Sequence, residues 1–419
     1  MTMEELEKCL RDKYCTRECP VYNGWLMQAA AGKMQAIYYH DKLNLKPSPH
    51  FIDMMYYCTT CKQCDIACDT QAAGINPSQK IIEMRRILAE KYKVPIPPVI
   101  NYLCNNISRR GNPFGVSHKK KASWATDLGI PSKGETIFFA TCFDPLMGYG
   151  ELLLERTNSF EKIGLNYKKL VGMFGKLQKV GLDQAVFRLS NRNKEYEASL
   201  THAAKILKKL GIEFSYLGSN EPCCGAPFHT YGLHDKFTEH VKGTYDDLKN
   251  LGVKRIITLN PVCSTILSDH YPEVIEGFDI EIQHFTEAVA ERLEKSGLRP
   301  QWGKNTRVVF HDPCYLSRYM KITEEPRKIL EHIKGLELVE PSKNRQATAC
   351  CGAGGLEATH PEEAKAISVK RAKELLETGA EMIVTCCSVC EMMLRTGVKI
   401  SGSDVEVVNI ADVLWKAIS

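Results

Sequence analysis

The chain has 419 residues, of which 44% are hydrophobic and 25% are charged, and its formal net charge is +5. This is the composition of a globular protein with room for two or three domains. The mild charge, without a Lys/Arg stripe interleaved with aromatic residues, argues against a nucleic-acid partner. No stretch approaches the roughly 20 apolar residues of a membrane-spanning helix, so we expect no transmembrane segment, and the polar N-terminus lacks the features of a secretory signal.

The 18 cysteines are the strongest feature of the sequence. We expect the protein in the cytoplasm, either alone or associated with a larger or membrane-bound complex. Because thiols stay reduced in that compartment, this many cysteines indicates metal or redox chemistry rather than disulfide bonds. The cysteines fall into three groups along the chain, and Cys104 stands apart from them.

Residues 1–95 are predicted to form a ferredoxin-like, two-cluster helical module, because apolar residues recur at helical spacing around two cysteine loops. The second loop has the complete spacing C-x2-C-x2-C-x3-C of a [4Fe–4S] cluster, and thiolates are soft ligands suited to iron. Its candidate ligands are Cys58, Cys61, Cys64 and Cys68.

The first loop follows the same pattern except at one position. Cys9, Cys15 and Cys19 are in place, but Asp12 occupies the second ligand position. When two such runs pair, the last cysteine of each binds the cluster of the other run. We therefore expect one cluster at Cys19, Cys58, Cys61 and Cys64, and a second cluster at Cys9, Cys15 and Cys68 whose fourth iron faces Asp12.

Three interpretations of Asp12 stay open. Its carboxylate can ligate iron and complete a [4Fe–4S] cluster, or the fourth iron can be missing, which gives a [3Fe–4S] cluster. A thiolate from elsewhere can also replace it, and Cys104 is the obvious donor. If Cys104 is not a ligand, we expect it to be a small buried hydrophobic side chain.

The rest of the chain is predicted to form a surface connector at 96–135, rich in Pro, Gly, Asn and Lys, and two repeated domains at 136–300 and 301–419. In each copy 38 residues lie between the second cysteine of a Cys-Cys-Gly loop and the cysteine of a Val-Cys pair. The alternation of strand-like and helix-like segments predicts small α/β units with parallel sheets, so the fold class is a multi-domain α+β and α/β protein. A Lys-rich, helical insertion at about 147–200 lengthens the first copy, as a partner-docking element or as a surface hairpin.

The two copies differ in their cysteines. The second copy has more candidate ligands than a tetrahedral Zn site needs, which indicates a polynuclear iron site, and Cys386 is expected to pack beside it. The first copy has Asn260 where the second has Cys387, so its four thiolates could hold either an iron–sulfur cluster or a structural Zn ion. The second copy offers Cys314, Cys350, Cys351, Cys387 and Cys390, and the first offers Cys142, Cys223, Cys224 and Cys263.

These motifs resemble the CCG-domain (cysteine-rich) iron–sulfur family, and the layout of the chain resembles the D subunit of heterodisulfide reductases. The resemblance implies that two ferredoxin-type clusters pass electrons to a noncubane [4Fe–4S] cluster, held by the five cysteines of the second CCG domain. A disulfide or thiol-type substrate would be reduced there, or the electrons would be passed on. Asn260 departs from the family pattern, in which each copy holds such a cluster.

The sequence therefore predicts an electron-transfer oxidoreductase subunit. The alternative is a pure relay between a flavoprotein or dehydrogenase and a quinone or terminal reductase. No Gly-rich dinucleotide fingerprint follows a strand, so we expect a flavoprotein or another redox subunit as partner. Near the cysteine loops, His229 and His311 are candidate acids that would protonate a leaving thiolate, and His360 is a weaker candidate.

Overall fold

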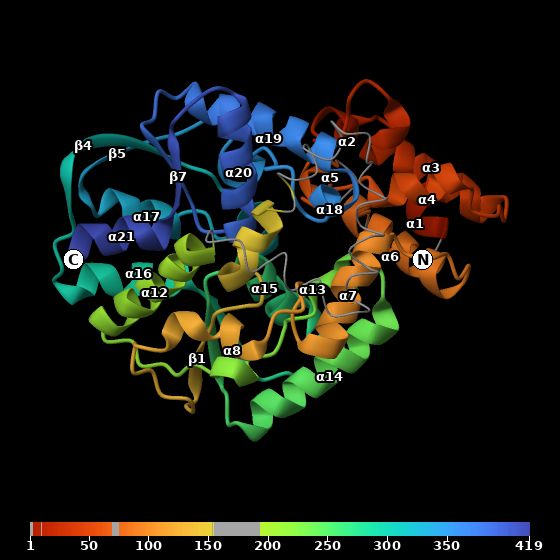
Figure 1. The fold of residues 1–419 in the computed structure, drawn as a ribbon. Coiled ribbons are helices and arrows are strands. Elements are labelled where there is room, and N and C mark those ends of the chain that lie inside the picture. The colour runs from red at the N-terminus through yellow and green to blue at the C-terminus, as the bar shows by residue number, and fades with distance from the viewer. Residues whose placement is uncertain (1–2, 10, 69–74, 153, 155–192) are drawn as a thin grey trace.

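The computed structural model describes residues 3–9, 11–68, 75–152, 154 and 193–419. Most of the insertion expected at 147–200 lies outside the described residues. Figure 1 shows the N-terminal helices gathered on one side of the molecule, beside the helices and strands of the two repeats. In the described part of the chain, no helix is long and apolar enough to cross a membrane.

In the N-terminal module the apolar faces of four helices, α1, α3, α4 and α6, are rich in methionine and isoleucine and meet in one core. Helix boundaries follow local chemistry: the Ser48 hydroxyl accepts a hydrogen bond from the Phe51 amide at the start of α4, and α6 begins at Pro77. The helices are α1 (Met3–Glu7), α2 (Tyr14–Arg17), η1 (Leu26–Gln28), α3 (Ala30–Lys42), α4 (Pro49–Tyr56), α5 (Gln63–Ile66) and α6 (Pro77–Glu90). The segment predicted as the connector contains α7 (Pro98–Arg110), whose buried residues pack in a cluster with the first repeat, then α8 (His118–Lys121) and η3 (Ser123–Ala125).

The first repeat contains a three-stranded parallel sheet in the order β1-β2-β3, in which Ile137 lies opposite Ile256. Strands β1 and β2 are short runs of mostly buried apolar residues, as expected for parallel strands covered on both faces. The elements are β1 (Thr136–Phe139), η4 (Asp144–Leu146), α12 (Asn193–Lys209), η5 (Gly218–Asn220), α13 (Ala226–Thr230), α14 (His234–Asn250), β2 (Arg255–Thr258), α15 (Pro261–Thr265), the π-helical turn η6 (Ile266–His270), β3 (Glu281–His284), α16 (Phe285–Leu293) and η7 (Glu294–Ser296).

The second repeat contains a four-stranded parallel sheet in the order β5-β4-β6-β7, in which Val309 lies opposite both Val339 and Ile383. The elements are β4 (Gln301–Phe310), the π-helical turn η8 (Tyr315–Tyr319), α17 (Glu325–Glu331), β5 (Lys334–Val339), η9 (Arg345–Ala347), α18 (Leu356–Thr359), α19 (Pro361–Leu376), β6 (Met382–Thr385), α20 (Ser388–Ile400), β7 (Glu406–Asn409) and α21 (Ile410–Ile418).

The two sheets have the same topology, with β1, β2 and β3 corresponding to β4, β6 and β7. Strand β5 has its counterpart in a single parallel bridge between Ile137 and Ser215. Asn260 and Cys387 both come two residues after the corresponding strands β2 and β6, which agrees with the alignment of the copies by sequence. The predicted fold class, a helical two-cluster module followed by two α/β repeats with parallel sheets, is confirmed.

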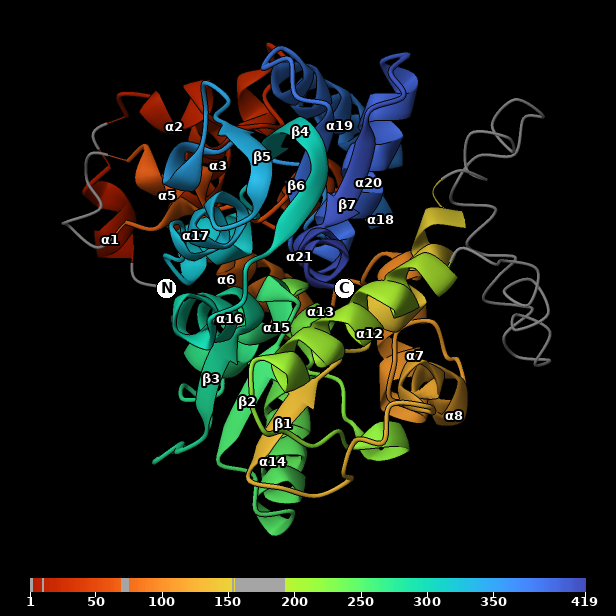
Figure 2. The same ribbon diagram turned by 90° about the vertical axis from the view of Figure 1, so that its left-hand side faces the viewer.

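The two repeats share a hydrophobic core. Phe138 of β1, Phe310 of β4 and Leu200 of α12 are fully buried in one cluster that extends into both sheets. Helices α12 and α21 pack against each other, and Figure 2 shows both of them between the two sheets. The repeats are therefore joined by an apolar interface, which fixes the position of one cysteine group relative to the other.

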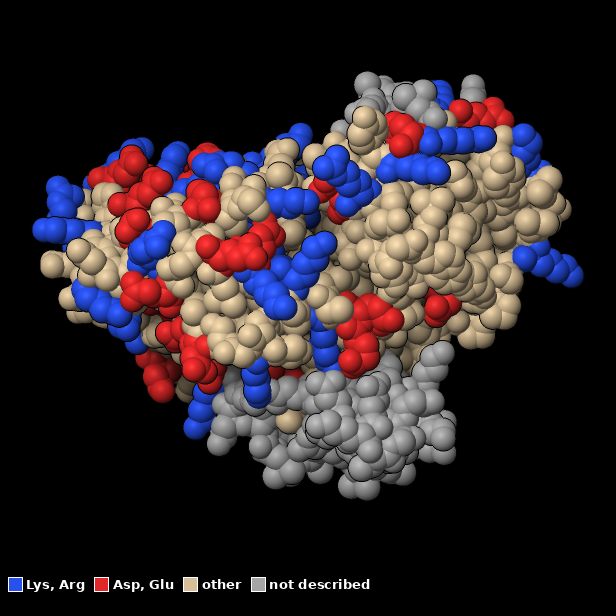
Figure 3. Space-filling model, turned by 90° about the horizontal axis from the view of Figure 1, so that it is seen from above, with Lys and Arg blue, Asp and Glu red and all other residues tan. Residues whose placement is uncertain are grey.

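The surface differs between the N-terminal module and the repeats. In Figure 3 charges of both signs are interspersed over the repeats on the left, whereas the part over the N-terminal module on the right is mostly uncharged. Seven large hydrophobic side chains of this module are more than 40% exposed. They are Tyr14, Tyr22, Trp25, Tyr39, Leu43, Leu45 and Ile66.

Candidate iron–sulfur and metal sites

The two N-terminal cysteine loops have the same backbone shape. Arg11 and Lys13 have positive φ angles of 60° and 66°, and Thr60 and Lys62 have φ angles of 50° and 64° at the corresponding positions. Lys13 and Lys62 each precede a one-turn helix, α2 and α5. Asp12 therefore stands in the first loop where Cys61 stands in the second.

Each loop contributes to a small cavity that is lined by ligands from both runs. One cavity has Lys33 in its wall beside four cysteines, and the other has Asp12 in its wall beside three. The structure thus brings together the residues that the exchange of last cysteines predicts. The first cavity is lined by Cys19, Cys58, Cys61 and Cys64, and the second by Cys9, Asp12, Cys15 and Cys68.

Lys33 places a buried positive charge at the first of these cavities. Its side chain is fully buried, and its ammonium group donates a hydrogen bond to the Gln28 carbonyl. Burial lowers the pKa of Lys33, and the neighbouring thiolates act in the opposite direction. Burial raises the pKa of Cys19 to about 11, an effect that the charge of Lys33 reduces. A cation among these cysteines favours their thiolate form, which binds iron.

Cys104 does not lie at the Asp12 cavity. It is fully buried in α7, in a hydrophobic cluster that contains Cys142 and Cys223 of the first repeat. Burial raises the pKa of Cys104 to about 12. The structure therefore does not bring this thiol to the open ligand position at Asp12, and it matches the packing role instead.

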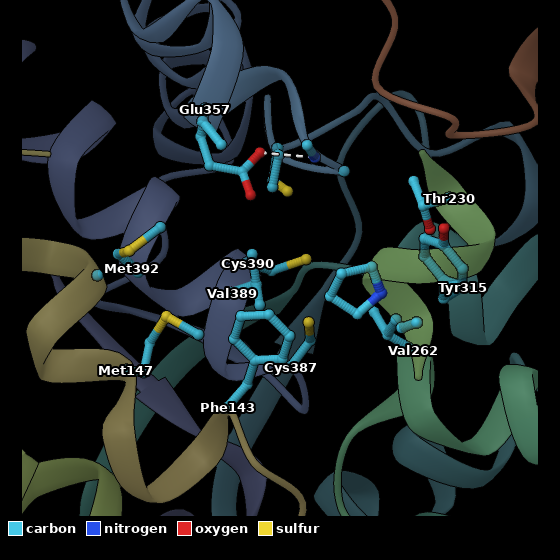
Figure 4. Close-up of a pocket in the computed structure, with 18 of the residues that line it drawn as sticks. Phe143, Met147, Thr230, Val262, Tyr315, Glu357, Cys387, Val389, Cys390 and Met392 are labelled. Carbon is cyan, nitrogen blue, oxygen red and sulfur yellow. Dashed lines mark hydrogen bonds between the residues drawn. The ribbon is translucent and has the colours of Figure 1, made fainter. Parts of the chain in front are cut away.

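The second repeat gathers its five candidate cysteines around one large cavity of about 180 Å³ (Figure 4). Parallel strands explain this meeting, because residues that follow β4 and β6 emerge at the same edge of the sheet. Burial raises the pKa of Cys314 well above its ordinary value. Uncompensated thiolates would be costly here, so the donor set fits a bound metal centre, which deprotonates its thiol ligands. The five are Cys314, Cys350, Cys351, Cys387 and Cys390.

The loop at 58–64 of the N-terminal module lies directly against this second site. The thiols of Cys61 and Cys350 lie close enough for each to shift the pKa of the other, and the pKa of Cys61 is raised. The Tyr319 hydroxyl donates to the Thr60 carbonyl at 2.7 Å, and a Cβ on Gly354 would lie 1.8 Å from the Thr59 carbonyl oxygen. Only glycine fits so close a contact, and its φ of +84° also favours glycine.

Arg318, in the π-turn η8, joins the same two sites. Its guanidinium donates to the carbonyl of Cys61 on one side and to the carbonyls of Gln346 and Thr348, at 2.9 Å each, on the other. Burial lowers the pKa of Arg318, but the charges of the surrounding cysteines outweigh this, so the pKa is raised overall. Its Nη2 is buried and has no partner among the described residues, which leaves a donor free at the boundary between the two cysteine groups.

His311 also faces the second site. Its Nδ1 accepts a hydrogen bond from Arg371 at 3.2 Å, and one of its nitrogens lies within 4.8 Å of the sulfurs of Cys351 and Cys390. Its Nε2 is buried without a partner in the part of the chain that the structure describes. Burial, followed by the charge of Arg371, lowers the pKa of His311 to about 3. His311 therefore lies where its ring can donate an N–H toward the sulfurs, and its role as the acid for a leaving thiolate stays a prediction.

The first repeat has a more compact cysteine group. The sulfurs of Cys142 and Cys223 are 3.1 Å apart, those of Cys224 and Cys263 are also 3.1 Å apart, and all four residues are fully buried. None of the four lines the large cavity of the second repeat.

Asn260 does not face this group as a missing ligand would. Its amide donates to Asp144 at 2.8 Å and to the Ser388 hydroxyl at 3.3 Å. Its oxygen accepts from the Val262 amide and caps α15. Asn260 thus links the first repeat to the start of α20 in the second.

The other two histidines have different surroundings. His229 stacks on His270 with ring centroids 3.8 Å apart and does not line the large cavity. Burial lowers the pKa of His229 to about 3. His360 packs on Tyr57 and lies 3.4 Å from the Asp53 carboxylate, so it joins α18 to the N-terminal module. The structure brings His311, but neither of these two, to the sulfurs of the second site.

Three residues at these sites carry no motif of their own. These residues reach the sites only through the folding of the chain, and they are Lys33, Arg318 and Glu357. Of the three, only Arg318 has a signal in the sequence, because it lies four residues after Cys314. Glu357 lines the large cavity, and one of its carboxylate oxygens accepts from the Gly355 amide at 2.8 Å. Burial raises the pKa of Glu357 to about 6.

Comparison with known proteins finds two kinds of domain in the chain. A 4Fe-4S dicluster domain family matches residues 5–72, and a cysteine-rich domain family, CCG, matches residues 189–268 and 308–395. One solved structure, a hypothetical protein from Helicobacter pylori, covers 100% of this chain and 73% of its own with a TM-score of 0.57 and 12% identity, which supports the fold alone.

Three curated relatives cover most of the chain. It is 29% identical to the probable iron-sulfur-binding oxidoreductase FadF of Bacillus subtilis, over 82% of this chain and 43% of that protein. It is 29% identical to the EtfAB:quinone oxidoreductase of Syntrophomonas wolfei, over 87% of this chain and 46% of that protein. It is 25% identical to the D subunit of the dihydromethanophenazine:CoB--CoM heterodisulfide reductase of Methanosarcina acetivorans, over 99% of this chain and 94% of that relative.

The chain thus spans less than half the length of the first two relatives and nearly all of the third. The domain order found in the structure, helical module first and α/β repeats after it, is the order in which the two family matches occur. The chain therefore belongs to the CCG cysteine-rich domain family, with a 4Fe-4S dicluster domain before the repeats, and its layout resembles that of the D subunit of a heterodisulfide reductase.

Proposed function

We propose that this chain is an electron-transfer subunit that receives electrons at the N-terminal module and delivers them at the second CCG site. The packing of the loop that holds Cys61 against the second site carries the proposal, because the bond from Arg318 to the Cys61 carbonyl and the close approach of Gly354 to Thr59 place one ligand group beside the next. Iron–sulfur clusters, when bound at these residues, would supply one-electron transfer and tunable potentials. The relatives named as iron–sulfur oxidoreductases and as part of a heterodisulfide reductase support this class of activity.

The donor sets suggest which group each site would hold. Two ferredoxin-type clusters would occupy the N-terminal cavities, with Asp12 as the fourth ligand of one of them. The five cysteines of the second repeat, together with the large cavity that they line, fit a noncubane [4Fe–4S] cluster. The protein's own contribution there is a free N–H from His311 and the charge of Arg318, both of which favour a reduced, more negative centre.

We propose Zn rather than a cluster for the first repeat. Four buried thiols in two close pairs match the four ligands of a structural Zn ion, with Zn–S distances of about 2.3 Å. A cluster would need a larger space between the sulfurs, and Asn260 is engaged in bonds to Asp144 and Ser388. On this proposal the first repeat supports the position of the second instead of carrying electrons.

The N-terminal module is the proposed docking face for a redox partner. It carries the seven large exposed hydrophobic residues. It also bears the Asp12 cavity, whereas the module's other cavity, lined by Cys61, is the one whose loop contacts the second CCG site. Exposed apolar patches on a folded protein commonly mark interaction sites. A flavoprotein or another redox subunit would supply electrons here, and we expect this exchange in the cytoplasm.

The alternative is a relay without a substrate of its own, in which the second site hands electrons to another subunit. The name of the Syntrophomonas relative, an EtfAB:quinone oxidoreductase, favours this possibility. The cavity beside the five cysteines favours a reaction with a small molecule instead, because a relay does not need a cavity at its last centre.

The experiment uses the full chain reconstituted with iron and sulfide. A reduced viologen dye should reduce it, and adding a disulfide or a quinone should reoxidise it, as followed by cluster absorbance. A chain in which Cys350 is replaced by Ser should accept electrons at the N-terminal module but lose reoxidation by the small molecule. If both proteins are reoxidised at the same rate, the second site is not the exit for electrons.

A further inference from the structure

The large cavity extends beyond the five cysteines into an apolar region. Two methionines and an aromatic ring converge there on Gly150, where an added Cβ would lie 3.3 Å from the Met147 sulfur, 3.5 Å from the Met392 sulfur and 3.6 Å from the Phe114 ring. Figure 4 shows Met147, Met392 and Phe143 beside Cys387 and Cys390. We call this region the apolar pocket; its walls are Phe114, Phe143, Met147, Gly150, Leu154 and Met392.

The charge of the lining is one-sided. Among the described residues that line the cavity there is no Lys, Arg or His, and Glu357 is the one carboxylate. Figure 4 shows Glu357 above the cysteines, with its carboxylate held by the Gly355 amide. The remaining ionisable groups of the lining are cysteines and tyrosines, which add no positive charge. A negatively charged ligand would therefore lose its hydration beside the Glu357 carboxylate, and none of the described lining residues offers it a cation.

We propose that the apolar pocket binds an uncharged, largely apolar electron acceptor, and that Gly150 and Glu357 determine this specificity. Gly150 leaves room for the apolar body of the ligand between the two methionines. Glu357 opposes a ligand that carries negative charge. This inference rests on the proposed function, because the acceptor is the molecule that would be reduced beside the five cysteines.

Two kinds of molecule share the required chemistry. An uncharged disulfide takes up two electrons and two protons, its S–S bond breaks, and two thiols form. An uncharged quinone takes up two electrons and two protons and becomes a quinol without breaking a bond. In the test below, a reduced viologen supplies the electrons in two one-electron steps, and the buffer supplies the protons.

The test compares two disulfides of similar size that differ in charge. Bis(2-hydroxyethyl) disulfide is uncharged and bis(2-sulfoethyl) disulfide carries two negative charges; menadione serves as the uncharged quinone. Binding to the reconstituted full chain is measured by equilibrium dialysis, and KM is measured with reduced viologen. We expect the anionic disulfide to bind about 10- to 30-fold more weakly than the uncharged one, which is the size of like-charge repulsion over several ångströms in a partly buried site.

Two variants address the two parts of the proposal. Gly150→Val should weaken binding of the uncharged disulfide and of menadione at least tenfold, while Gly243→Val, at a glycine of α14 with nothing within 4 Å, should not. Glu357→Gln should bring the anionic disulfide to within about threefold of the uncharged one. Glu331→Gln, at an exposed position of α17, is its control.

The outcomes separate this inference from the proposed function. Equal binding of both disulfides by the wild-type chain, or an unchanged preference in Glu357→Gln, overturns the charge argument. Unchanged binding in Gly150→Val overturns the pocket. In either case the chain can still take up electrons from viologen, and the proposed function then stands; if viologen fails to reduce it, the proposed function itself fails. Turnover of the disulfide alone or of menadione alone identifies the acceptor class, and both results support an uncharged ligand.

Discussion

Replacing Arg318 with methionine should lower the reduction potentials of the two centres that it separates. Reduction adds negative charge, and a buried guanidinium stabilises the reduced state, so its loss makes reduction harder at both sites. The side chain is 3% exposed, and the charges that raise its pKa are those of cysteines and Tyr319, so its charge is balanced mainly by the ligand groups themselves.

The expected size of the shift is that of one hydrogen bond from the Arg318 Nη2 to the charged centre bound beside it. The Nη2 donor of Arg318 has no partner among the described residues, and one hydrogen bond to a charged group contributes about 1.5–3 kcal/mol. For a one-electron couple, about 1.4 kcal/mol corresponds to 59 mV, so we expect a decrease of about 60–130 mV. Arg318→Lys keeps the charge but cannot reach both sides with a planar fork, so its shift should be smaller.

The assay is a potentiometric titration of the reconstituted chain followed by EPR, with iron content measured on each variant. Arg307→Met is the control, because this arginine of β4 has a side chain that is 46% exposed and pairs with Glu337. Unchanged potentials in Arg318→Met, at full iron content, would refute the electrostatic role of Arg318. A shift at only one of the two centres would show that it does not lie between them in the bound state.

Three further predictions concern other sites. Asp12→Cys should convert the first cluster to a conventional all-thiolate [4Fe–4S] centre with an altered EPR spectrum and potential; an identical spectrum would mean that Asp12 is not a ligand. Metal analysis should give one Zn and about 12 Fe per chain, as three [4Fe–4S] clusters require. The variant Cys263→Ser should lose the Zn alone. Loss of iron from that variant would instead place a cluster in the first repeat. Burial lowers the pKa of His284 from 6.5 to about 4, so the stability that this residue contributes is present above pH 6.5 and is lost as the pH falls toward 4. His284→Asn, which can keep the helix cap, should therefore show about 3 kcal/mol less change in unfolding free energy between pH 7 and pH 4 than the wild type, measured by denaturant titration; parallel curves would contradict this assignment.

Much of the fold follows from local patterns in the sequence. The equal spacing in the two repeats requires equal α/β units, and the short apolar runs at β1, β2 and β6 are typical of strands buried on both faces. The cysteine spacing in the N-terminal loops likewise predicts which residues share a cavity, because in paired runs the last cysteine of each binds the cluster of the other. These features are set by residues that lie close together in the chain, and for that reason they can be predicted from the sequence.

Contacts between distant segments were not predictable in the same way. Arg318 contacts the carbonyl of Cys61, 257 residues away, and no periodicity in the sequence links the two positions. Gly150 and Glu357 line one cavity although helices and a whole sheet separate them along the chain. Asn260 could be identified as a lost ligand, but its bonds to Asp144 and Ser388 depend on how the repeats pack.

The two repeats show how one structural unit can take two roles. Cys387 of the second repeat and Asn260 of the first occupy equivalent positions after strands β6 and β2, and both line the large cavity. Asn260 also bonds across the interface between the repeats. A cysteine at 260 could not replace the bonds of Asn260 to Asp144, whose carboxylate would then lose its amide donor in a buried site. The loss of a ligand in the first repeat thus stabilises the interface that holds the second in place. The asymmetry between the copies is therefore a consequence of their packing, and it leaves one compact thiol group and one that opens to a cavity.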